Sequence, residues 1–258
     1  MTRLLIVPAA GRGSRLSSAG PKLLVEVAGR PMIDHVLARY VHAVDRAIVV
    51  VSPAAESPSR RHLGAAPMPV DIAIQEEPTG MLDAILIPLA AAARRPPSSV
   101  WITWCDQIGI GTATVARLIE TTADGLADLA LPTVQVPEPY VHFVRHADGR
   151  IVRVLQRREG DDMPAVGETD GGLFALSAAA YLEHLPAFAA AAGEEGARTG
   201  ERNFTPFIPW MASRGEVRTF PLDDPMEAVG VNTPVELRQM EAWLAARAQR
   251  TCQPPPQP

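Results

Sequence analysis

The sequence contains little cysteine, no excess of basic residues and no long apolar run. Its 258 residues include two cysteines, Cys105 and Cys252, and six histidines without metal-ligand spacing. We therefore expect neither a disulfide framework nor a cysteine-based zinc site. The apolar run Leu4–Val7 is far shorter than the roughly 20 residues of a membrane span, which predicts a cytoplasmic protein.

The balance of charge is slightly acidic. The chain has 24 lysines and arginines against 29 acidic residues, a formal net charge of −5, and its basic residues are scattered. An anionic partner would therefore be bound in a pocket, and we expect neither nucleic acid nor membrane as a partner. With 47% hydrophobic residues, the chain can bury one sizeable core, as a monomer or a homo-oligomer.

The first hundred residues alternate between short apolar runs and helical patterns. Leu4–Val7 is continuously apolar and leads into Pro and Gly, which is typical of a strand buried on both faces of a parallel sheet. Similar runs occupy 47–51, 70–74 and 100–104, and helical patterns occupy 31–40, 56–63 and 81–94. This order predicts an α/β fold, a Rossmann-like doubly wound mixed sheet that binds ligands at the carboxyl ends of its strands.

The pattern changes at about Ala127. Closely spaced strands are predicted over 129–136, 139–145 and 151–156. They indicate a small antiparallel extension of the sheet. Helical patterns return over 177–185, 204–213 and 234–248. We expect a single domain over residues 1–248 and a disordered tail over 249–258.

A glycine-bearing loop follows the first strand. Pro8–Leu16 reads Pro-Ala-Ala-Gly-Arg-Gly-Ser-Arg-Leu, and Pro21-Lys22 comes shortly after. Such glycines let backbone N–H groups approach phosphate oxygens, while Arg15 and Lys22 add positive charge. A dinucleotide fingerprint would need glycine in place of Leu16, and a P-loop would need a terminal Gly-Lys-Ser/Thr. A plain strand-turn with surface Arg and Lys is the alternative interpretation.

Two side chains with oxygen ligands occur later in the chain. Asp106 directly follows an apolar strand, so its carboxylate would face the ligand crevice, where oxygen ligands suit Mg²⁺ bound together with phosphates. Taken alone, it could equally be a turn residue or a helix cap. Asn232 in Gly230–Pro234 precedes a predicted helix, for which it is also a suitable N-cap.

Together these motifs resemble, in order, those of the nucleoside-triphosphate transferase superfamily. The shared features are Ala-Ala-Gly-x-Gly-x-Arg with a downstream Pro-Lys, an Asp at a strand end, and Gly-Val-Asn before a helix. The resemblance covers roughly residues 3 to 245. Among the kin are sugar-1-phosphate nucleotidylyltransferases such as the uridylyltransferase domain for N-acetylglucosamine 1-phosphate.

The resemblance implies roles for particular residues. Arg15 and Lys22 would be catalytic, and Asp106 and Asn232 would be ligands of Mg²⁺. The residues implied to contact the nucleotide are Pro8, Ala9, Ala10, Gly11, Arg12, Gly13, Gln75, Gly80, Met81, Trp104 and Cys105. Residues 1–126 would form a nucleotide-binding half and 127–232 an acceptor-binding half, followed by a C-terminal helix over 233–248.

The sequence departs from its kin at several of these positions. Met81 replaces a threonine near the base, so uracil selectivity is not carried over. Cys105 replaces a glycine, which alters the close packing against the nucleotide sugar. The residues implied on the acceptor side are Tyr140, Gln156, Asp170 and Gly172. Asp170 stands where the kin often have an asparagine, Val141 follows Tyr140 where they have a glycine, and Gln156 stands where the uridylyltransferases have a glutamate near the sugar. These three departures together argue against N-acetylglucosamine 1-phosphate as the acceptor.

The sequence therefore predicts a magnesium-dependent nucleotidylyltransferase. It would transfer a nucleoside monophosphate from an NTP to a sugar 1-phosphate and release pyrophosphate. A cytidylyltransferase for phosphocholine, a phosphonate or a polyol phosphate is an alternative, supported by Asp83 in Gly-x-x-Asp-Ala, although Asp83 also suits the first turn of a helix. A non-catalytic nucleotide-binding regulatory protein is a third possibility.

Two further stretches receive structural interpretations. Phe204, Phe207 and Trp210 recur at helical spacing and are predicted to lie in the core. The acidic run Asp223–Glu227 could supplement a metal site near Asn232, but we interpret it as a solvated loop.

Overall fold

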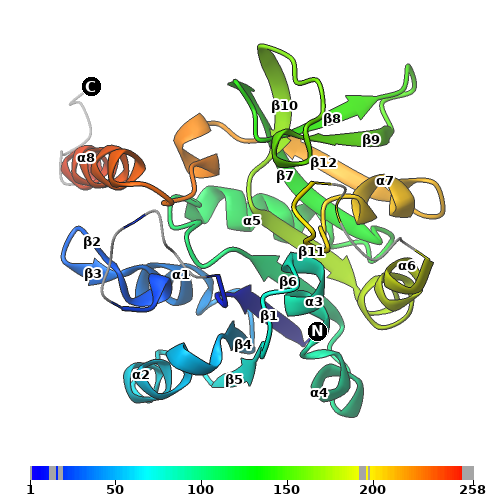
Figure 1. Cartoon of the computed structure of the whole chain (residues 1–258). Helices are drawn as coiled ribbons and strands as arrows, with labels where there is room; N and C mark the ends of the chain where they lie inside the picture. The colour runs from blue at the N-terminus through cyan, green and yellow to red at the C-terminus, as the bar shows by residue number, and fades with distance from the viewer. Residues whose placement is uncertain (1, 12–15, 17–19, 192–195, 197, 252–258) are drawn as a thin grey trace, which may run out of the picture.

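The centre of the protein is an eight-stranded mixed sheet (Figure 1). The computed structural model describes residues 2–11, 16, 20–191, 196 and 198–251. Seven strands follow the order β10-β7-β11-β6-β1-β4-β5, and β12 pairs with β7. Their bounds are β1 (Arg3–Pro8), β4 (Arg46–Val51), β5 (Val70–Ile74), β6 (Ser99–Thr103), β7 (Leu129–Pro137), β10 (Val166–Asp170), β11 (Leu173–Ser177) and β12 (Val217–Pro221).

Strand direction divides the sheet into two parts. β1, β4, β5 and β6 run parallel, whereas β11 is antiparallel to both β6 and β7, and β10 is antiparallel to β7. The predicted α/β class with a mixed sheet is thus confirmed. Parallel strands bring their carboxyl ends to one edge, where open α/β sheets generally bind ligands.

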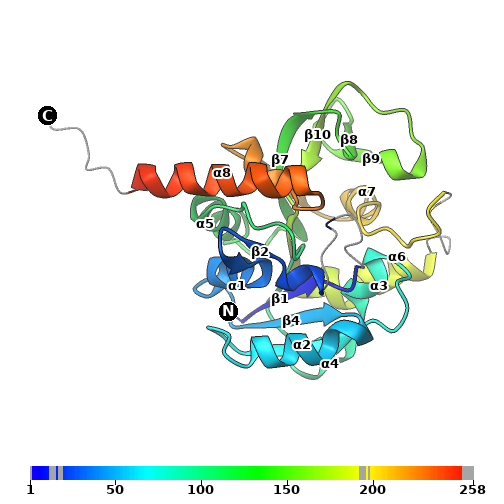
Figure 2. The ribbon, with the colours of Figure 1, turned by 60° about the vertical axis from the view of Figure 1, so that its left-hand side comes forward.

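Helices cover both faces of the sheet (Figure 1 and Figure 2). One face carries α1 (Met32–Tyr40), α2 (Pro53–Leu63), α5 (Thr112–Thr121) and α8 (Pro234–Thr251). The other carries α3 (Met81–Leu86), α4 (Leu89–Arg94), α6 (Leu185–Ala191) and α7 (Phe207–Ala212). Leu5 and Val7 of β1 pack into the first core, while Leu4 and Ile6 pack into the second. The two-residue period of a strand thereby gives the sheet two buried faces.

Two short antiparallel pairs are separate from the main sheet. β2 (Glu26–Val27) pairs with β3 (Arg30–Pro31), and β8 (Val141–Arg145) pairs with β9 (Ile151–Gln156). In Figure 1 the hairpin of β8 and β9 lies close to β10, at the opposite end of the sheet from β5. The strands predicted after Ala127 therefore extend the main sheet and also form a separate hairpin.

Several predicted helices differ from those in the structure. The pattern over 81–94 forms α3 and α4 instead of one helix, because Pro88 at the junction has no N–H to donate. The pattern over 177–185 becomes a π-helical turn, Ala180–His184, that leads into α6. The sequence did not predict α5 or β12. Among the described residues, no helix is long and apolar enough to span a membrane.

The aromatic residues predicted to lie in the core pack against one another. Phe204 and Phe207 are almost fully buried, with ring centroids 5.9 Å apart. Trp210 stacks on Phe207 at 5.7 Å. The prediction of a core role is confirmed for Phe204 and Phe207, whereas Trp210, which stacks on Phe207, is partly exposed.

Candidate active site

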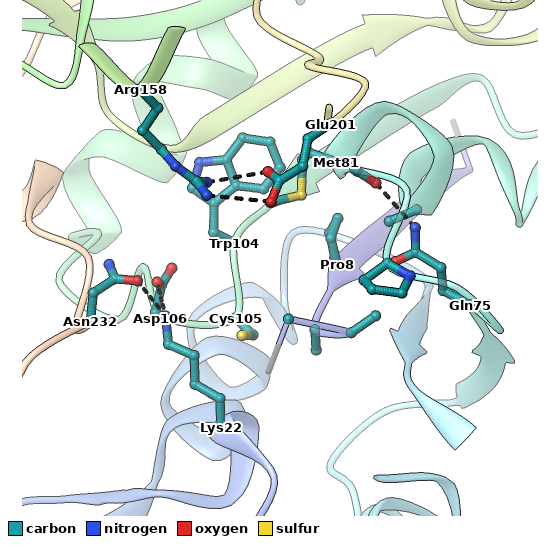
Figure 3. Close-up of a pocket in the computed structure, with 16 residues that line it drawn as sticks. Pro8, Lys22, Gln75, Met81, Trp104, Cys105, Asp106, Arg158, Glu201 and Asn232 are labelled. Atoms are coloured by element: carbon teal, nitrogen blue, oxygen red, sulfur yellow. Dashed lines mark hydrogen bonds and ion pairs between the residues drawn. The ribbon is translucent and has the colours of Figure 1, made fainter. Parts of the chain in front are cut away.

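A cavity of about 700 Å³ opens beyond the carboxyl ends of β1, β5 and β6 (Figure 3). Nine of the residues predicted to contact a nucleotide line it: Pro8, Ala9, Ala10, Gly11, Gln75, Gly80, Met81, Trp104 and Cys105. Lys22, Asp106 and Asn232 line it as well. The predicted residues Arg12, Gly13 and Arg15 lie outside the described residues.

The floor of the cavity is formed by three side chains from distant parts of the chain. Lys22 lies in a short 3-10 helix, Lys22–Leu24, Asp106 follows β6, and Asn232 precedes α8. The Lys22 Nζ donates a hydrogen bond to Asn232 Oδ1 at 2.7 Å and forms an ion pair with Asp106 Oδ2. The Lys22 and Asp106 side chains are only 10% and 13% exposed. We call Lys22 and Asp106 the floor pair.

Backbone contacts hold Asn232 next to Asp106. Val231 N donates to the Asp106 carbonyl at 3.1 Å, which joins the loop before α8 to the end of β6. At the start of α8, Thr233 Oγ1 accepts from Glu236 N at 3.3 Å, and Glu236 Oε2 accepts from Asn232 N at 2.9 Å. Thr233 therefore performs the capping considered for Asn232, whose side-chain oxygen instead contacts Lys22.

Glu227 corrects one interpretation of the acidic run. Its side chain is buried, not solvated, and Oε2 accepts hydrogen bonds from Gly111 N at 2.8 Å and Thr114 Oγ1 at 2.6 Å. Gln107 donates to its backbone carbonyl at 2.5 Å. Glu227 thereby fastens the loop after Asp106 to the loop that carries Asn232, so its role is structural support of the floor.

Gly80 adopts a conformation that requires glycine. Its φ is +129°, and a Cβ there would clash with the backbone of Arg202. The Gly80 carbonyl accepts from the buried Gln75 Nε2 at 3.1 Å, so both predicted residues shape the same wall. Asp83 lies in the first turn of α3 and forms an ion pair with Arg202 at 2.6 Å.

Trp104 and Cys105 form the back of the cavity. The Trp104 ring packs against Phe174 at 5.4 Å and Phe204 at 6.2 Å, which fixes it over the second core. Burial, followed by the nearby charge of Asp106, raises the pKa of the Cys105 thiol to about 12. The thiol is therefore protonated at neutral pH and acts as a small packed side chain.

The four residues predicted on the acceptor side do not line this cavity. Tyr140 is 62% exposed. The Gln156 side chain accepts from Thr205 Oγ1 at 3.3 Å. Asp170 Oδ1 accepts from Gly172 N at 2.8 Å in the turn between β10 and β11, and burial raises the pKa of the Asp170 carboxyl.

Two charged residues at the upper wall of the cavity were not predicted. Arg158 and Glu201 line the cavity and form two contacts, from Nη1 to Oε2 at 3.2 Å and from Nη2 to Oε1 at 3.3 Å. We call them the rim pair. Arg158 lies two residues beyond Gln156, which was a weak signal in the sequence. Glu201 had none, because its position depends on contacts with distant residues.

The mixed sheet, with a lysine and two side-chain oxygens meeting at the carboxyl ends of its strands, has the architecture of a nucleotidyltransferase. The chain belongs to the family of MobA-like NTP transferase domains, whose model matches residues 5–199. The resemblance to nucleoside-triphosphate transferases stated from the motifs is thereby confirmed.

Two curated relatives are similar to most of the chain. The chain is 30% identical over 255 residues to the bifunctional protein GlmU of Mycolicibacterium gilvum, covering 94% of this chain and 49% of that protein. It is also 30% identical over 243 residues to GlmU of Burkholderia mallei, covering 92% and 51%. The chain therefore spans about half the length of these curated relatives.

A solved structure shares the fold. It is described as a glucose-1-phosphate thymidylyltransferase from Bacillus anthracis in complex with sucrose. The two chains superpose with a TM-score of 0.76 at 16% identity, over 94% of this chain and 95% of the other.

Proposed function

We propose that the chain transfers a nucleoside monophosphate from an NTP to a sugar 1-phosphate and releases pyrophosphate. The convergence of Lys22, Asp106 and Asn232 carries this proposal, since positions 84 and 210 residues away from Lys22 meet its ammonium. The cavity of about 700 Å³ beside them lies within the ordinary range for small-molecule sites.

The oxygen atoms at the floor fit a magnesium ion. Asp106 Oδ2 and Asn232 Oδ1 both contact one positively charged group, the Lys22 ammonium, so they already form a small cation-binding set. One or two protein oxygens, completed by water and substrate phosphates, are the usual donors to Mg²⁺. Asp106 and Asn232 would hold the ion, which when bound would supply positive charge to the phosphates.

The residues of the chain would act mainly by charge and alignment. A phosphate oxygen of the acceptor attacks the α-phosphorus as the bond to pyrophosphate breaks on the opposite side. That oxygen is already ionised at neutral pH, so no general base is needed. Lys22 would donate hydrogen bonds to the reacting phosphates, and the Pro8–Gly11 loop would lie along the nucleotide. From its place in the motif, Arg15 would bind the β- and γ-phosphates.

We further propose a division of labour between the two halves of the domain. Residues 1–126 would bind the nucleotide, because nine of the predicted nucleotide contacts line the cavity. Residues 127–232 would bind the acceptor, since Arg158 and Glu201 reach the same cavity from that half.

A phosphocholine cytidylyltransferase is less well supported by the site. Asp83, which suggested that branch, is held by Arg202 in an ion pair. The carboxylates among the described residues that line the cavity, Asp106 and Glu201, are also paired with basic side chains. A quaternary ammonium would therefore have to compete with Lys22 or Arg158 for its counter-charge.

The proposed reaction is tested by measuring pyrophosphate release with Mg²⁺. CTP, UTP, dTTP, GTP and ATP are each combined with sugar 1-phosphates and, separately, with phosphocholine and phosphonates. Turnover with a sugar 1-phosphate that Asp106→Ala strongly reduces is the expected result. Turnover only with CTP and a non-sugar acceptor would replace the proposal with the cytidylyltransferase alternative. Nucleotide binding without any turnover would indicate the regulatory alternative.

A further inference from the structure

The rim pair presents both hydrogen-bond donors and acceptors to the cavity. Arg158 and Glu201 face each other through two nearly equal contacts, and their side chains are 62% and 37% exposed. In Figure 3 they lie close to the Trp104 ring, whereas Lys22 lies on the other side of the cavity. A ligand that fills this space would therefore meet the floor pair at one end and the rim pair at the other.

Glu201 is fixed in place by the segment on which it lies. Residues 198–203, which we call the rim segment, are fastened on one side by the Glu159 carboxylate. It accepts from Arg198 N at 3.0 Å, Thr199 Oγ1 at 2.5 Å and Asn203 Nδ2 at 2.9 Å. These bonds, the one from Thr199 foremost, lower the pKa of Glu159 to about 2. Since Glu159 directly follows Arg158, one turn positions both members of the rim pair.

The other side of the rim segment is fastened to the nucleotide half. Arg202 N donates to the Thr79 carbonyl at 2.8 Å, and the Arg202 carbonyl accepts from Leu82 N at 3.0 Å. The Arg202 guanidinium binds Asp83 at 2.6 Å. Glu201 therefore lies between two anchors, and its carboxylate is held at the cavity without the help of a ligand, as a preorganised recognition group should be.

We propose that Arg158 and Glu201 select the acceptor by binding two neighbouring hydroxyl groups of its sugar ring. This inference rests on the proposed function and deepens it. The guanidinium donates to hydroxyl oxygens, while the carboxylate accepts hydroxyl protons, so the pair matches a diol. The exposed fractions of both side chains leave their outer atoms within reach of a ligand.

The same chemistry disfavours an acceptor with a quaternary ammonium group. A quaternary ammonium has no proton for Glu201 and cannot accept from Arg158, so it would break the rim pair without replacing its hydrogen bonds. A sugar ring replaces them, and its phosphate end is left to face Lys22. The rim pair thus favours a polyhydroxylated phosphate over phosphocholine.

The test compares acceptor and nucleotide kinetics in four variants. Arg158→Gln and Glu201→Gln each remove one charge, and the swapped variant Arg158→Glu/Glu201→Arg restores an ion pair with reversed polarity. Asp148→Asn is the matched control, because Asp148 forms an exposed ion pair with Arg150 in the β8–β9 hairpin, outside the cavity lining. The acceptors are glucose 1-phosphate, its singly deoxygenated analogues and phosphocholine.

We expect both single variants to lower kcat/KM for glucose 1-phosphate by roughly 10- to 100-fold, through the KM of the acceptor. The KM of the NTP should change by less than about twofold, and the swapped variant should not recover. For the deoxygenated analogue that lacks a hydroxyl bound by the rim pair, the kcat/KM values of wild type and variant should converge, because the variant then has no interaction with that hydroxyl left to lose. The Asp148→Asn control should match wild type.

Two results would overturn the inference alone, in a wild-type enzyme that uses glucose 1-phosphate. One is an unchanged acceptor KM in both single variants. The other is full recovery in the swapped variant, which would make the pair a structural tie. If the wild type turned over phosphocholine alone, or no acceptor, the proposed function would fail together with the inference.

Discussion

The floor pair and the rim pair differ in burial and in origin. Lys22 and Asp106 are 10% and 13% exposed, whereas Arg158 and Glu201 are 62% and 37% exposed. Asp106 follows a central parallel strand, so the sheet itself brings it to the edge where ligands bind. On the acceptor side, the strands β10, β7 and β11 are antiparallel and alternate in direction, so their carboxyl ends do not meet at one edge. The rim pair comes instead from the turn 157–160, which carries Arg158, and from the rim segment, which carries Glu201. Chemistry and acceptor recognition are thus expected to depend on different kinds of support.

The largest effect should come from removing the floor carboxylate. We expect Asp106→Ala to lower kcat by roughly 100- to 1000-fold, because it removes a charged group beside the reacting phosphates. Pyrophosphate release measures the loss, and nucleotide binding by calorimetry checks that the cavity persists. Asp71→Asn on β5, with a side chain 75% exposed, is the control. Near-normal turnover in Asp106→Ala would remove the floor pair from the mechanism.

The junction between the two regions should be the most sensitive point for stability. Gly80→Ala places a side chain at a φ of +129° against the backbone of Arg202. We expect about 2–4 kcal/mol lower stability in urea denaturation. Gly125→Ala is the matched control, since its φ is +72° but nothing lies within 4 Å of the added Cβ, and it should cost about 1 kcal/mol. Equal losses would show that the contact with Arg202 does not matter.

Neutralising one lysine and one arginine compares the two pairs directly. Lys22→Met leaves a nearly buried carboxylate without its ion pair and should cost about 1–3 kcal/mol in the absence of divalent cations. Arg158→Met disrupts an exposed pair and should cost less than about 1 kcal/mol. Urea denaturation of both variants gives the comparison. A larger loss of stability for Arg158→Met would show that the rim pair contributes more to stability than the floor pair.

Acidification should weaken the attachment of the rim segment, and this is the smallest of the expected effects. The pKa of Glu159 is about 2 in the folded protein, below its ordinary value of 4.5, so its contribution to stability is present above about pH 4.5 and is lost as the pH falls toward 2. Glu159→Gln should therefore have a lower Tm than wild type at pH 7, and the gap should narrow at pH 3. A gap that widened on acidification would contradict this sign.

Local patterns in the sequence were sufficient for the parallel part of the fold. The run 70–74 coincides with β5, and the apolar runs near Leu4 and Val100 lie within one residue of β1 and β6. Lys22, Asp106 and Asn232, implied as one site by the order of their motifs, do lie together. Strand ends and glycine turns are local signals, and the sheet then brings them to one edge.

The remaining features depend on contacts between distant residues. Glu201 is positioned through Glu159 and Asp83, by way of residues on its own segment, and no short window of sequence contains these partners. We interpreted Glu227 as solvated from the sequence, because its buried position depends on Thr114 of α5, a helix that was not predicted. The break at Pro88 was readable in principle, since proline interrupts helical hydrogen bonding.

The attachment of the rim segment to Glu159 has a consequence for redesign. Arg158 and Glu159 are consecutive, and the first faces the cavity while the second holds the segment that carries Glu201. Grafting residues 198–203 from a relative would import a new carboxylate position without its anchor. The turn 157–160 and the rim segment would have to be exchanged as one unit, leaving the parallel strands and the phosphate chemistry proposed for their ends unchanged.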